Sequence, residues 1–327
     1  MPTVLDDVIR FLACPHCGEP LVREGMSLRC RAGHAFDVAR QGYVSLLPPG
    51  GKRNAGDTAA MVQAREDFLA AGYFGHVAAE LADAAVAAAG GAAAEAAGGA
   101  AAVAAAGGVA AEAAGGAATK PASGEAGGGC IVDVGAGTGY YLAEVLARLP
   151  GRAGLALDAS RFALRRAARA HQRIGAAACD VWHRLPVASG AAAVVLNVFA
   201  PRNGVELQRI LAPGGRLLVI TPTALHMREL IPALGLLTVD RHKDERLSRT
   251  LDRYFSLSEK RDILRTVILN HKDIGAAVMM GPSAWQSDPV ARQERIRQLP
   301  EPLPVTLSVT LSCWRRRSAS GEDKAHD

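Results

Sequence analysis

The most informative stretch of this chain is residues 131–141, IVDVGAGTGYY. Its apolar run, Ile131–Val134, predicts a buried strand, and residues 141–149 after it predict a helix. Glycine lacks a Cβ, so the three glycines between these elements let the backbone approach a ligand closely. A dinucleotide-binding loop would carry its last glycine at position 140, which is Tyr140 here. The stretch therefore indicates a nucleotide-type loop that departs from the NAD form.

Strands and helices alternate after this loop. Apolar runs predict strands at Leu155–Leu157, Ala176–Ala178, Ala192–Val198, Leu217–Thr221 and Val305–Trp314, with a turn at Pro213–Gly215 and a helix over Arg161–Arg173. Such alternation implies an α/β fold in which helices cover both faces of a parallel sheet. We therefore expect a Rossmann-like domain with a parallel-rich sheet.

Acidic residues stand at three predicted strand ends, where open parallel sheets bind their ligands. Asp158 lies 19 residues beyond Gly139 and is placed to accept hydrogen bonds from both ribose hydroxyls. Asp180 can meet an adenine amino group, and Asp133 can orient a cationic methionine end. With Gly135 and Gly139, these positions predict an S-adenosylmethionine site. Another nucleotide, or a turn that binds no ligand, remains an alternative.

A second pattern lies near the N-terminus. Cys14 and Cys17 are separated by two residues, twelve residues follow, and Cys30 is then separated from His34 by three. Two close pairs on tight turns can close one tetrahedral site, and three thiolates with one imidazole are a structural zinc set. We expect one zinc ion per chain, with no open position for catalysis and with His16 outside the ligand set.

Composition divides the 327-residue chain into five parts. We expect a zinc-binding module over residues 1–49, a helical linker over 50–83 with its helix near 56–81, and an Ala/Gly-rich insert over 84–129. The insert has nothing large to bury, so it should be partly helical or disordered. A methyltransferase-type domain then covers 130–317, and a flexible tail covers 318–327.

The cysteine content, the apolar runs and the net charge limit the cellular compartments and partners that suit the protein. Its six cysteines are not accompanied by a signal peptide, and no apolar run is long enough to span a bilayer. We therefore expect a cytoplasmic protein with reduced thiols and no membrane partner. The formal net charge of +5 suits a polyanionic partner without requiring one.

Because it carries the zinc pattern and then the glycine loop, the chain resembles the 23S rRNA guanine-N1 methyltransferases. This family includes the tylosin- and mycinamicin-type resistance enzymes of macrolide producers. The resemblance covers nearly all of the chain except the Ala/Gly insert and the tail. Besides the zinc pattern, it rests on these stretches: 34–37, 42–48, 56–58, 61–65, 68–74, 198–203, 222–226 and 280–285.

This resemblance implies a zinc module and a methyltransferase domain that line an RNA-binding cleft, usually in a homodimer. It implies that Gly137 and Thr138 contact the cofactor and that His226 reaches it. Phe74 stands where the family often has a tyrosine near the cofactor, so the contact of that hydroxyl is lost here. The run Asn197–Asn203 resembles the macrolide-resistance subclass, whose substrate is a guanine in a 23S rRNA hairpin loop near the macrolide site.

Transfer to guanine N1 requires removal of the N1 proton, and the sequence offers no unambiguous base. Asn197 can bind the base edge or cap its strand, and backbone carbonyls around Phe199 and Pro201 can orient the base. Phe199, Tyr73 and Trp285 are possible stacking residues, although a core role suits each equally well.

Two other functions remain open at this point. The first is a small-molecule methyltransferase in which the zinc module is only a stabilising cap. The second is a binding module without activity that keeps a cofactor fold, and the intact Asp133, Asp158 and glycines count against it.

Overall fold

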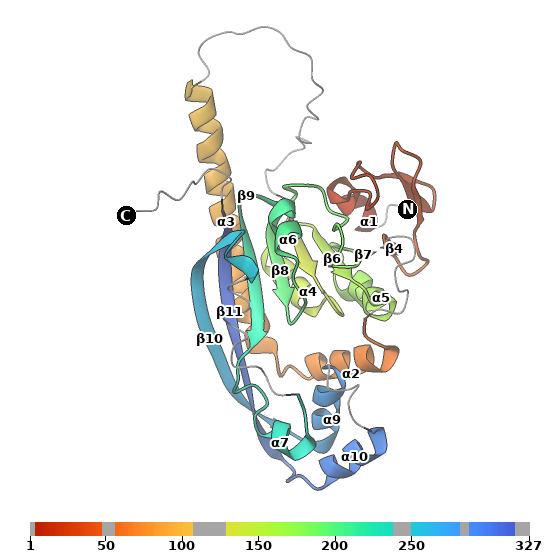
Figure 1. Cartoon of the computed structure of the whole chain (residues 1–327), viewed down its shortest axis with the longest axis vertical. Helices are drawn as coiled ribbons and strands as arrows, with labels where there is room; N and C mark the ends of the chain where they lie inside the picture. The colour runs from red at the N-terminus through yellow and green to blue at the C-terminus, as the bar shows by residue number, and fades with distance from the viewer. Residues whose placement is uncertain (1–3, 48–55, 107–128, 238–249, 282–287, 318–327) are drawn as a thin grey trace.

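An eight-stranded sheet forms the centre of the protein (Figure 1). The computed structural model describes residues 4–47, 56–106, 129–237, 250–281 and 288–317. The strand order is β10-β11-β9-β8-β5-β6-β7-β4. The parallel strands are β4 (Tyr43–Ser45), β5 (Cys130–Val134), β6 (Gly154–Asp158), β7 (Ile174–Ala178), β8 (Ala192–Val198) and β9 (Leu211–Pro222).

Two antiparallel strands, β10 (Phe255–Leu269) and β11 (Leu303–Arg316), complete the sheet beside β9. The predicted Rossmann-like fold with a parallel-rich sheet is confirmed, and the late strand predicted at 305–314 is the antiparallel β11. The sequence did not predict β10. This strand lies at the edge of the sheet and is mostly exposed, so it carries charges instead of an alternating apolar pattern.

Successive residues of the central strands feed two separate cores, one on each face of the sheet. Ile131 and Val194 belong to the core that contains α3 (Gly75–Ala106), α4 (Tyr140–Arg148) and α5 (Arg161–Ala170). Val132 and Val195 belong to the opposite core, with α1 (Val4–Val8), the 3-10 turn Ile9–Phe11 and α6 (Gly204–Ile210). Helices on both faces explain why the central strands are almost wholly apolar.

A group of four helices lies beyond the carboxyl ends of the parallel strands (Figure 1). It consists of α2 (Ala59–Ala70), α7 (Leu230–Leu234), α9 (His271–Met279) and α10 (Pro289–Arg297). α2 packs on α9, and α10 contacts both α9 and α7. This group therefore covers the sheet edge at which the sequence places its ligand site.

The N-terminal module packs directly on the sheet. Its own three-stranded sheet consists of β1 (Val22–Glu24), β2 (Ser27–Arg29) and β3 (Ala35–Asp37). The next strand, β4, leaves this module and pairs in parallel with β7 of the large sheet. Leu28 and Phe36 also share one core with Val132 and Leu155. The module is thus joined to the large domain by a strand and by a common core.

The segment between β4 and β5 differs in detail from the sequence prediction. The helix expected near 56–81 is two helices, because α2 ends before a turn in which Gly72 has φ +81°. The second helix, α3, continues through the boundary expected at residue 84 and reaches Ala106. Alanine is the best helix former, and its run outweighs the Gly-Gly pairs at 90–91 and 98–99. Among the described residues, no helix has the length and apolarity needed to cross a membrane.

The predicted turn at 213–215 is a bulge inside β9. Ala192 of β8 pairs with Leu211, and Val194 pairs with Arg216, so residues 212–215 stand opposite a single residue. Gly214 has φ +75°, which suits such a distortion. Turn chemistry was therefore recognised correctly, although the strand extends across it.

We predict that Gly175→Ala lowers the free energy of unfolding by about 1–3 kcal/mol, the usual cost of overpacking. A Cβ on Gly175 of β7 would lie 2.1 Å from Val8 Cγ2, so α1 would have to move. Urea denaturation followed by circular dichroism measures the change. Val8→Ala removes the clash, so the double variant should lose less stability than the two single losses added together; strict additivity would contradict this packing.

Candidate metal cluster and cofactor cavity

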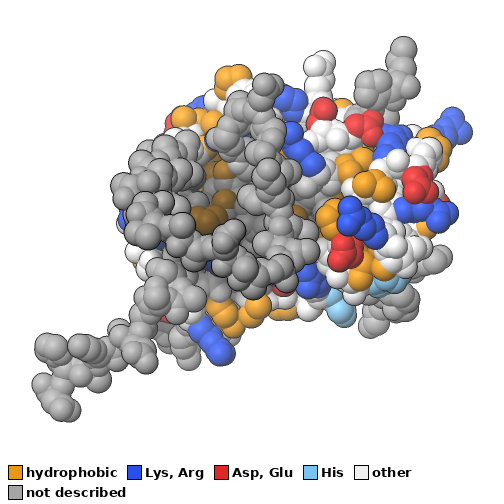
Figure 2. Space-filling view, turned by 90° about the horizontal axis from the view of Figure 1, so that it is seen from above, with side chains coloured by type: hydrophobic (Ala, Val, Ile, Leu, Met, Phe, Trp, Pro, Cys, Tyr) orange, Lys and Arg blue, Asp and Glu red, His pale blue; other side chains and the backbone are white. Residues whose placement is uncertain are grey.

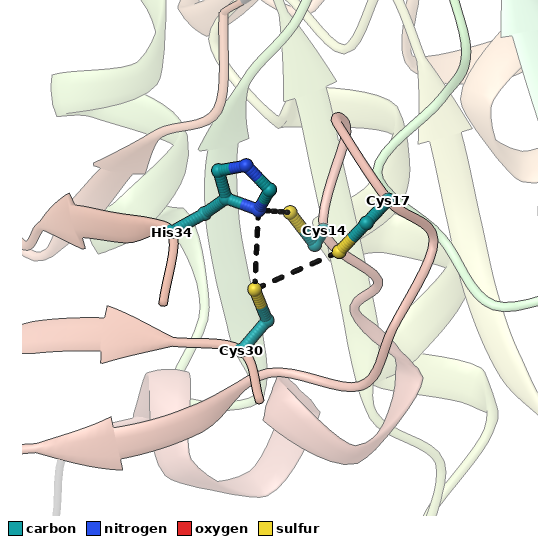
Figure 3. Close-up of side chains that lie close together, drawn as sticks. All are labelled: Cys14, Cys17, Cys30 and His34. Carbon is teal, nitrogen blue, oxygen red and sulfur yellow. Dashed lines mark hydrogen bonds between the residues drawn. The ribbon is translucent and has the colours of Figure 1, made fainter. Parts of the chain in front are cut away.

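Four metal-binding side chains meet in the N-terminal module (Figure 3). The sulfur atoms of Cys14, Cys17 and Cys30 and a nitrogen of His34 all lie within 4.8 Å of one another. Cys17 Sγ is 3.6 Å from Cys30 Sγ, and Cys30 Sγ is 3.3 Å from His34 Nδ1. Ligand atoms around a tetrahedral zinc with Zn–S bonds of about 2.3 Å lie about 3.8 Å apart, so this donor set fits structural zinc.

Two tight turns bring these ligands together. Gly18 N–H donates to the Cys14 carbonyl, and Gly33 N–H donates to the Cys30 carbonyl, both glycines having positive φ. Burial raises the pKa of Cys30, but hydrogen bonds from His34 and neighbouring cysteines outweigh it and lower the value to about 7. His16 lies outside the four-atom cluster and packs its ring against Phe36 at 5.7 Å.

The glycine loop between β5 and α4 has the close packing that its sequence predicts. Gly135, Gly137 and Gly139 all have positive φ, between 54° and 82°. A Cβ on Gly135 would lie 2.3 Å from Ala200 Cβ, and one on Gly139 would lie 2.9 Å from Ala167 Cα. Any side chain at these two positions would therefore push apart the loop and its neighbours.

This loop borders a cavity of about 530 Å³ between the sheet edge and the helices that cover it. Asp133, at the end of β5, lines the cavity and is only 1 % exposed. Its Oδ1 has no hydrogen-bond partner among the described residues. Burial, together with the nearby Asp158, raises the pKa of Asp133 to about 8. A buried carboxylate without a partner is costly, so this atom suits a cationic or hydrogen-bond-donating ligand group.

Arg65 of α2 also lines the cavity, although no sequence motif indicates a role for it in the site. Its guanidinium pairs with Asp57 and donates to the Met280 carbonyl at 2.7 Å. A Cβ on Gly137 would lie 3.3 Å from Arg65 Nη1, so the guanidinium rests on the glycine loop. Only the fold brings α2 to this loop, although the stretch 61–65 was part of the family resemblance.

Asp158 and Asp180 lie at the predicted strand ends but are not among the residues that line the cavity. Asp158 accepts hydrogen bonds from the backbone N–H groups of Gly137 and Ser160, each at 2.8 Å. Asp180 accepts one from Trp182 N–H at 3.0 Å and contacts His183. Both carboxylates therefore hold loops at the sheet edge in this structure.

Three aromatic rings from distant segments meet at the cavity. Phe74 lies 5.8 Å from Phe199, and each ring lies 6.1 Å from His226. Phe74 is buried, whereas Phe199 is 42 % exposed. Phe199 has φ 53°, a left-handed conformation that a phenylalanine rarely adopts and that recurs at functional sites. Gly137 and Thr138 line the same cavity.

Asn197 and Pro201, the candidate catalytic residues besides Phe199, are not among the residues that line the cavity. Asn197 is fully buried, and its Nδ2 donates to the carbonyls of Val134 and Pro201. Its Oδ1 accepts from Arg202 at 2.9 Å. The Asn197 amide is thus used inside the protein, which favours its strand-end role over contact with a base edge.

Tyr73 and Trp285 are the two remaining candidates for stacking on a base. Tyr73 is bound through its hydroxyl to Asp273 at 2.7 Å, which ties α9 to the turn before α3. Trp285 lies outside the described residues. Of the three aromatic residues proposed for stacking, Phe199 is the one that the structure places at the cavity.

Known proteins resemble this chain along almost its whole length. A family model described as the RlmA N-terminal zinc ribbon matches residues 12–54. A Micromonospora griseorubida protein named as a 23S rRNA (guanine-N1)-methyltransferase is 45 % identical, over 94 % of this chain and 98 % of its own length. The 23S rRNA (guanine(748)-N(1))-methyltransferase of Streptomyces fradiae is 44 % identical over the same shares.

Among solved structures, a methyltransferase from Bacillus halodurans is 16 % identical, with a TM-score of 0.40 over 58 % of this chain and 93 % of its own. The two full-length relatives match both the zinc module and the large domain. The chain therefore belongs to the 23S rRNA (guanine-N1)-methyltransferase family.

Proposed function

We propose that this protein transfers a methyl group from S-adenosylmethionine to N1 of a guanine in a 23S rRNA hairpin loop. The observation that carries the proposal is the Asp133 carboxyl, buried in a cavity beside the glycine loop, whose Oδ1 has no hydrogen-bond partner in the described part of the chain. The names and the full-length similarity of the two relatives support the substrate. The net charge of +5 agrees with a polyanionic partner.

The cavity suits the methionine end of S-adenosylmethionine at one side. Asp133 offers a carboxylate for the amino group, and Arg65 offers a cation for the carboxylate. The protein backbone of the glycine loop would approach the cofactor closely at Gly135, Gly137, Thr138 and Gly139. Asp158 and Asp180 would meet the ribose and adenine through further lone pairs of their carboxylates, beside the hydrogen bonds that they accept now.

When bound, the cofactor supplies an activated methyl group on a sulfonium, so the chain mainly positions the guanine and excludes water. Phe199, which is 42 % exposed and packs against the buried Phe74, offers a ring face beside the cavity for a base taken out of its stack. Ser308 N–H donates to His226 Nδ1 at 3.2 Å, which leaves the proton of the neutral ring on Nε2. His226 is thus suited to donate a hydrogen bond instead of accepting the N1 proton.

Finer assignments follow from the same proposal. The modified guanine would be the one at the macrolide site, giving macrolide resistance, because the run 197–203 resembles that subclass. Zn²⁺ would be held by Cys14, Cys17, Cys30 and His34, one ion per chain. The protein would act as a cytoplasmic homodimer built from the five parts expected from composition.

Figure 2 shows the end of the molecule opposite the helices that cover the cavity. In the face that Figure 2 shows, the described Lys and Arg side chains are interspersed with acidic and hydrophobic ones. The described side chains of this face, which lies opposite α2, α7, α9 and α10, therefore form no uniform positive field.

The test of the proposed function is methyl transfer to 23S rRNA that lacks the modification, mapped by mass spectrometry of nuclease fragments. We expect one new N1-methylguanine, in the hairpin loop that contains guanine 748, the nucleotide in the name of the S. fradiae relative. If neither naked rRNA nor ribosomal particles are methylated while cofactor binding is intact, the small-molecule alternative takes its place.

We predict that cofactor binding releases a proton from Asp133. With a pKa of about 8, this carboxyl is mostly protonated at pH about 7 in the free protein, and a bound ammonium group favours the ionised form. Calorimetry with S-adenosylhomocysteine in buffers of different ionisation enthalpy measures the proton count. Asp133→Asn should abolish the release and weaken binding by about 1.5–3 kcal/mol; unchanged release in this variant would place the titrating group elsewhere.

We also predict that Cys30→Ser lowers the zinc content well below one ion per chain, because three ligands bind zinc more weakly than four. A chelating dye measures the released metal, and RNA affinity should fall with it. Cys313→Ser is the matched control, since this cysteine lies outside the cluster. Equal zinc content in Cys30→Ser and wild type would exclude Cys30 as a ligand.

A further inference from the structure

The loop that follows β7 presents an exposed tryptophan. Trp182 is 66 % exposed, whereas Trp314 is 1 % exposed. His183 and Arg184, which follow it, are also exposed. A single exposed apolar side chain needs no explanation by itself, so its setting decides whether it has a role.

This loop is held firmly on both sides of the tryptophan. Asp180 accepts from Trp182 N–H at 3.0 Å, and its carbonyl accepts from His183 N–H at 3.1 Å. Beyond the exposed residues, Leu185 N–H donates to Glu206 at 2.7 Å. The indole is therefore carried outward on a fixed backbone, and binding through it costs little loop entropy.

The loop also lies between the cavity and the metal cluster. On one side, Asn203 Nδ2 donates to the Val181 carbonyl at 3.1 Å, and Asn203 belongs to the same loop as Phe199. On the other side, the Arg184 guanidinium lies against Gly18 of the zinc turn, 2.7 Å from where a Cβ would stand. Val181 and Arg184, on the two sides of Trp182, thus connect this loop to the loop of Phe199 and to the zinc module.

We propose that Trp182 is a stacking platform for an unpaired nucleotide of the RNA substrate, next to the guanine that enters the cavity. This inference rests on the proposed function and adds a specific recognition residue to it. Unpaired bases in RNA loops are read by stacking on exposed aromatic rings, with neighbouring cations on the phosphates. Arg184, two residues further along the same exposed loop, supplies such a cation, and His16 is exposed in the zinc turn that contains Gly18.

The experiment measures binding of a fluorescein-labelled RNA hairpin that contains guanine 748 and its loop. We expect Trp182→Ala to weaken binding about 5- to 150-fold, the range for loss of one base–aromatic stack. Trp182→Phe keeps a ring face and should bind within about 3-fold of wild type. Leu264→Ala is the matched control, because Leu264 is 58 % exposed on β10, at the opposite edge of the sheet.

Zinc content and S-adenosylhomocysteine affinity should stay unchanged in Trp182→Ala, which separates lost stacking from lost folding. If Trp182→Ala and the wild type bind the hairpin with equal affinity, the inference about Trp182 is overturned. The proposed function still stands in that case, provided that the wild type methylates the RNA. A defect seen only on ribosomal particles would assign Trp182 to a protein contact and also overturn it. If the wild type neither binds nor methylates the RNA, both proposals fall.

Discussion

The buried amide of Asn197 holds together the edge of the sheet on which the site is built. It joins the carbonyl at the end of β5 to the carbonyl of Pro201 in the loop after β8, and it accepts a hydrogen bond from Arg202. A fully buried amide is stable only when its donors and acceptor are satisfied, so these two strand ends are fixed relative to each other. The glycine loop follows one end, and Phe199 follows the other.

This arrangement separates two chemical environments within one cavity. Asp133 and Arg65 provide charge beside the glycine loop, while Phe74 and Phe199 provide apolar ring surface. Burial keeps a proton on the Asp133 carboxyl until a suitable partner arrives, because an unpaired charge there would be poorly solvated. Such a cavity is suited to hold a charged small molecule at one side and a flat base at the other.

The zinc module is fixed to the large domain by several contacts. Its β4 extends the large sheet, its side chains share the core of one sheet face, and Arg184 packs against one of its turns. A module of this size has too little apolar surface to fold firmly alone, so zinc and the sheet together define its position. The Arg184 contact also joins the zinc turn to the loop after β7 that carries Trp182.

The sequence alone determined the features that are encoded locally. The zinc ligands share two short spacings, the glycine loop needs residues without a Cβ, and β8 is apolar at nearly every position because helices cover both faces of the sheet.

The tertiary structure alone decided which side chains face the cavity. Arg65 reaches the glycine loop because α2 packs on α9, and Asn197 turns into the protein because two strand ends need its amide. The charged edge strand β10 was also beyond the sequence, since its hydrogen-bonding partner is a strand more than thirty residues away. Contacts between distant segments depend on how helices and strands pack together. Such packing requires no fixed number of residues between the contacting positions, so no sequence pattern reveals it.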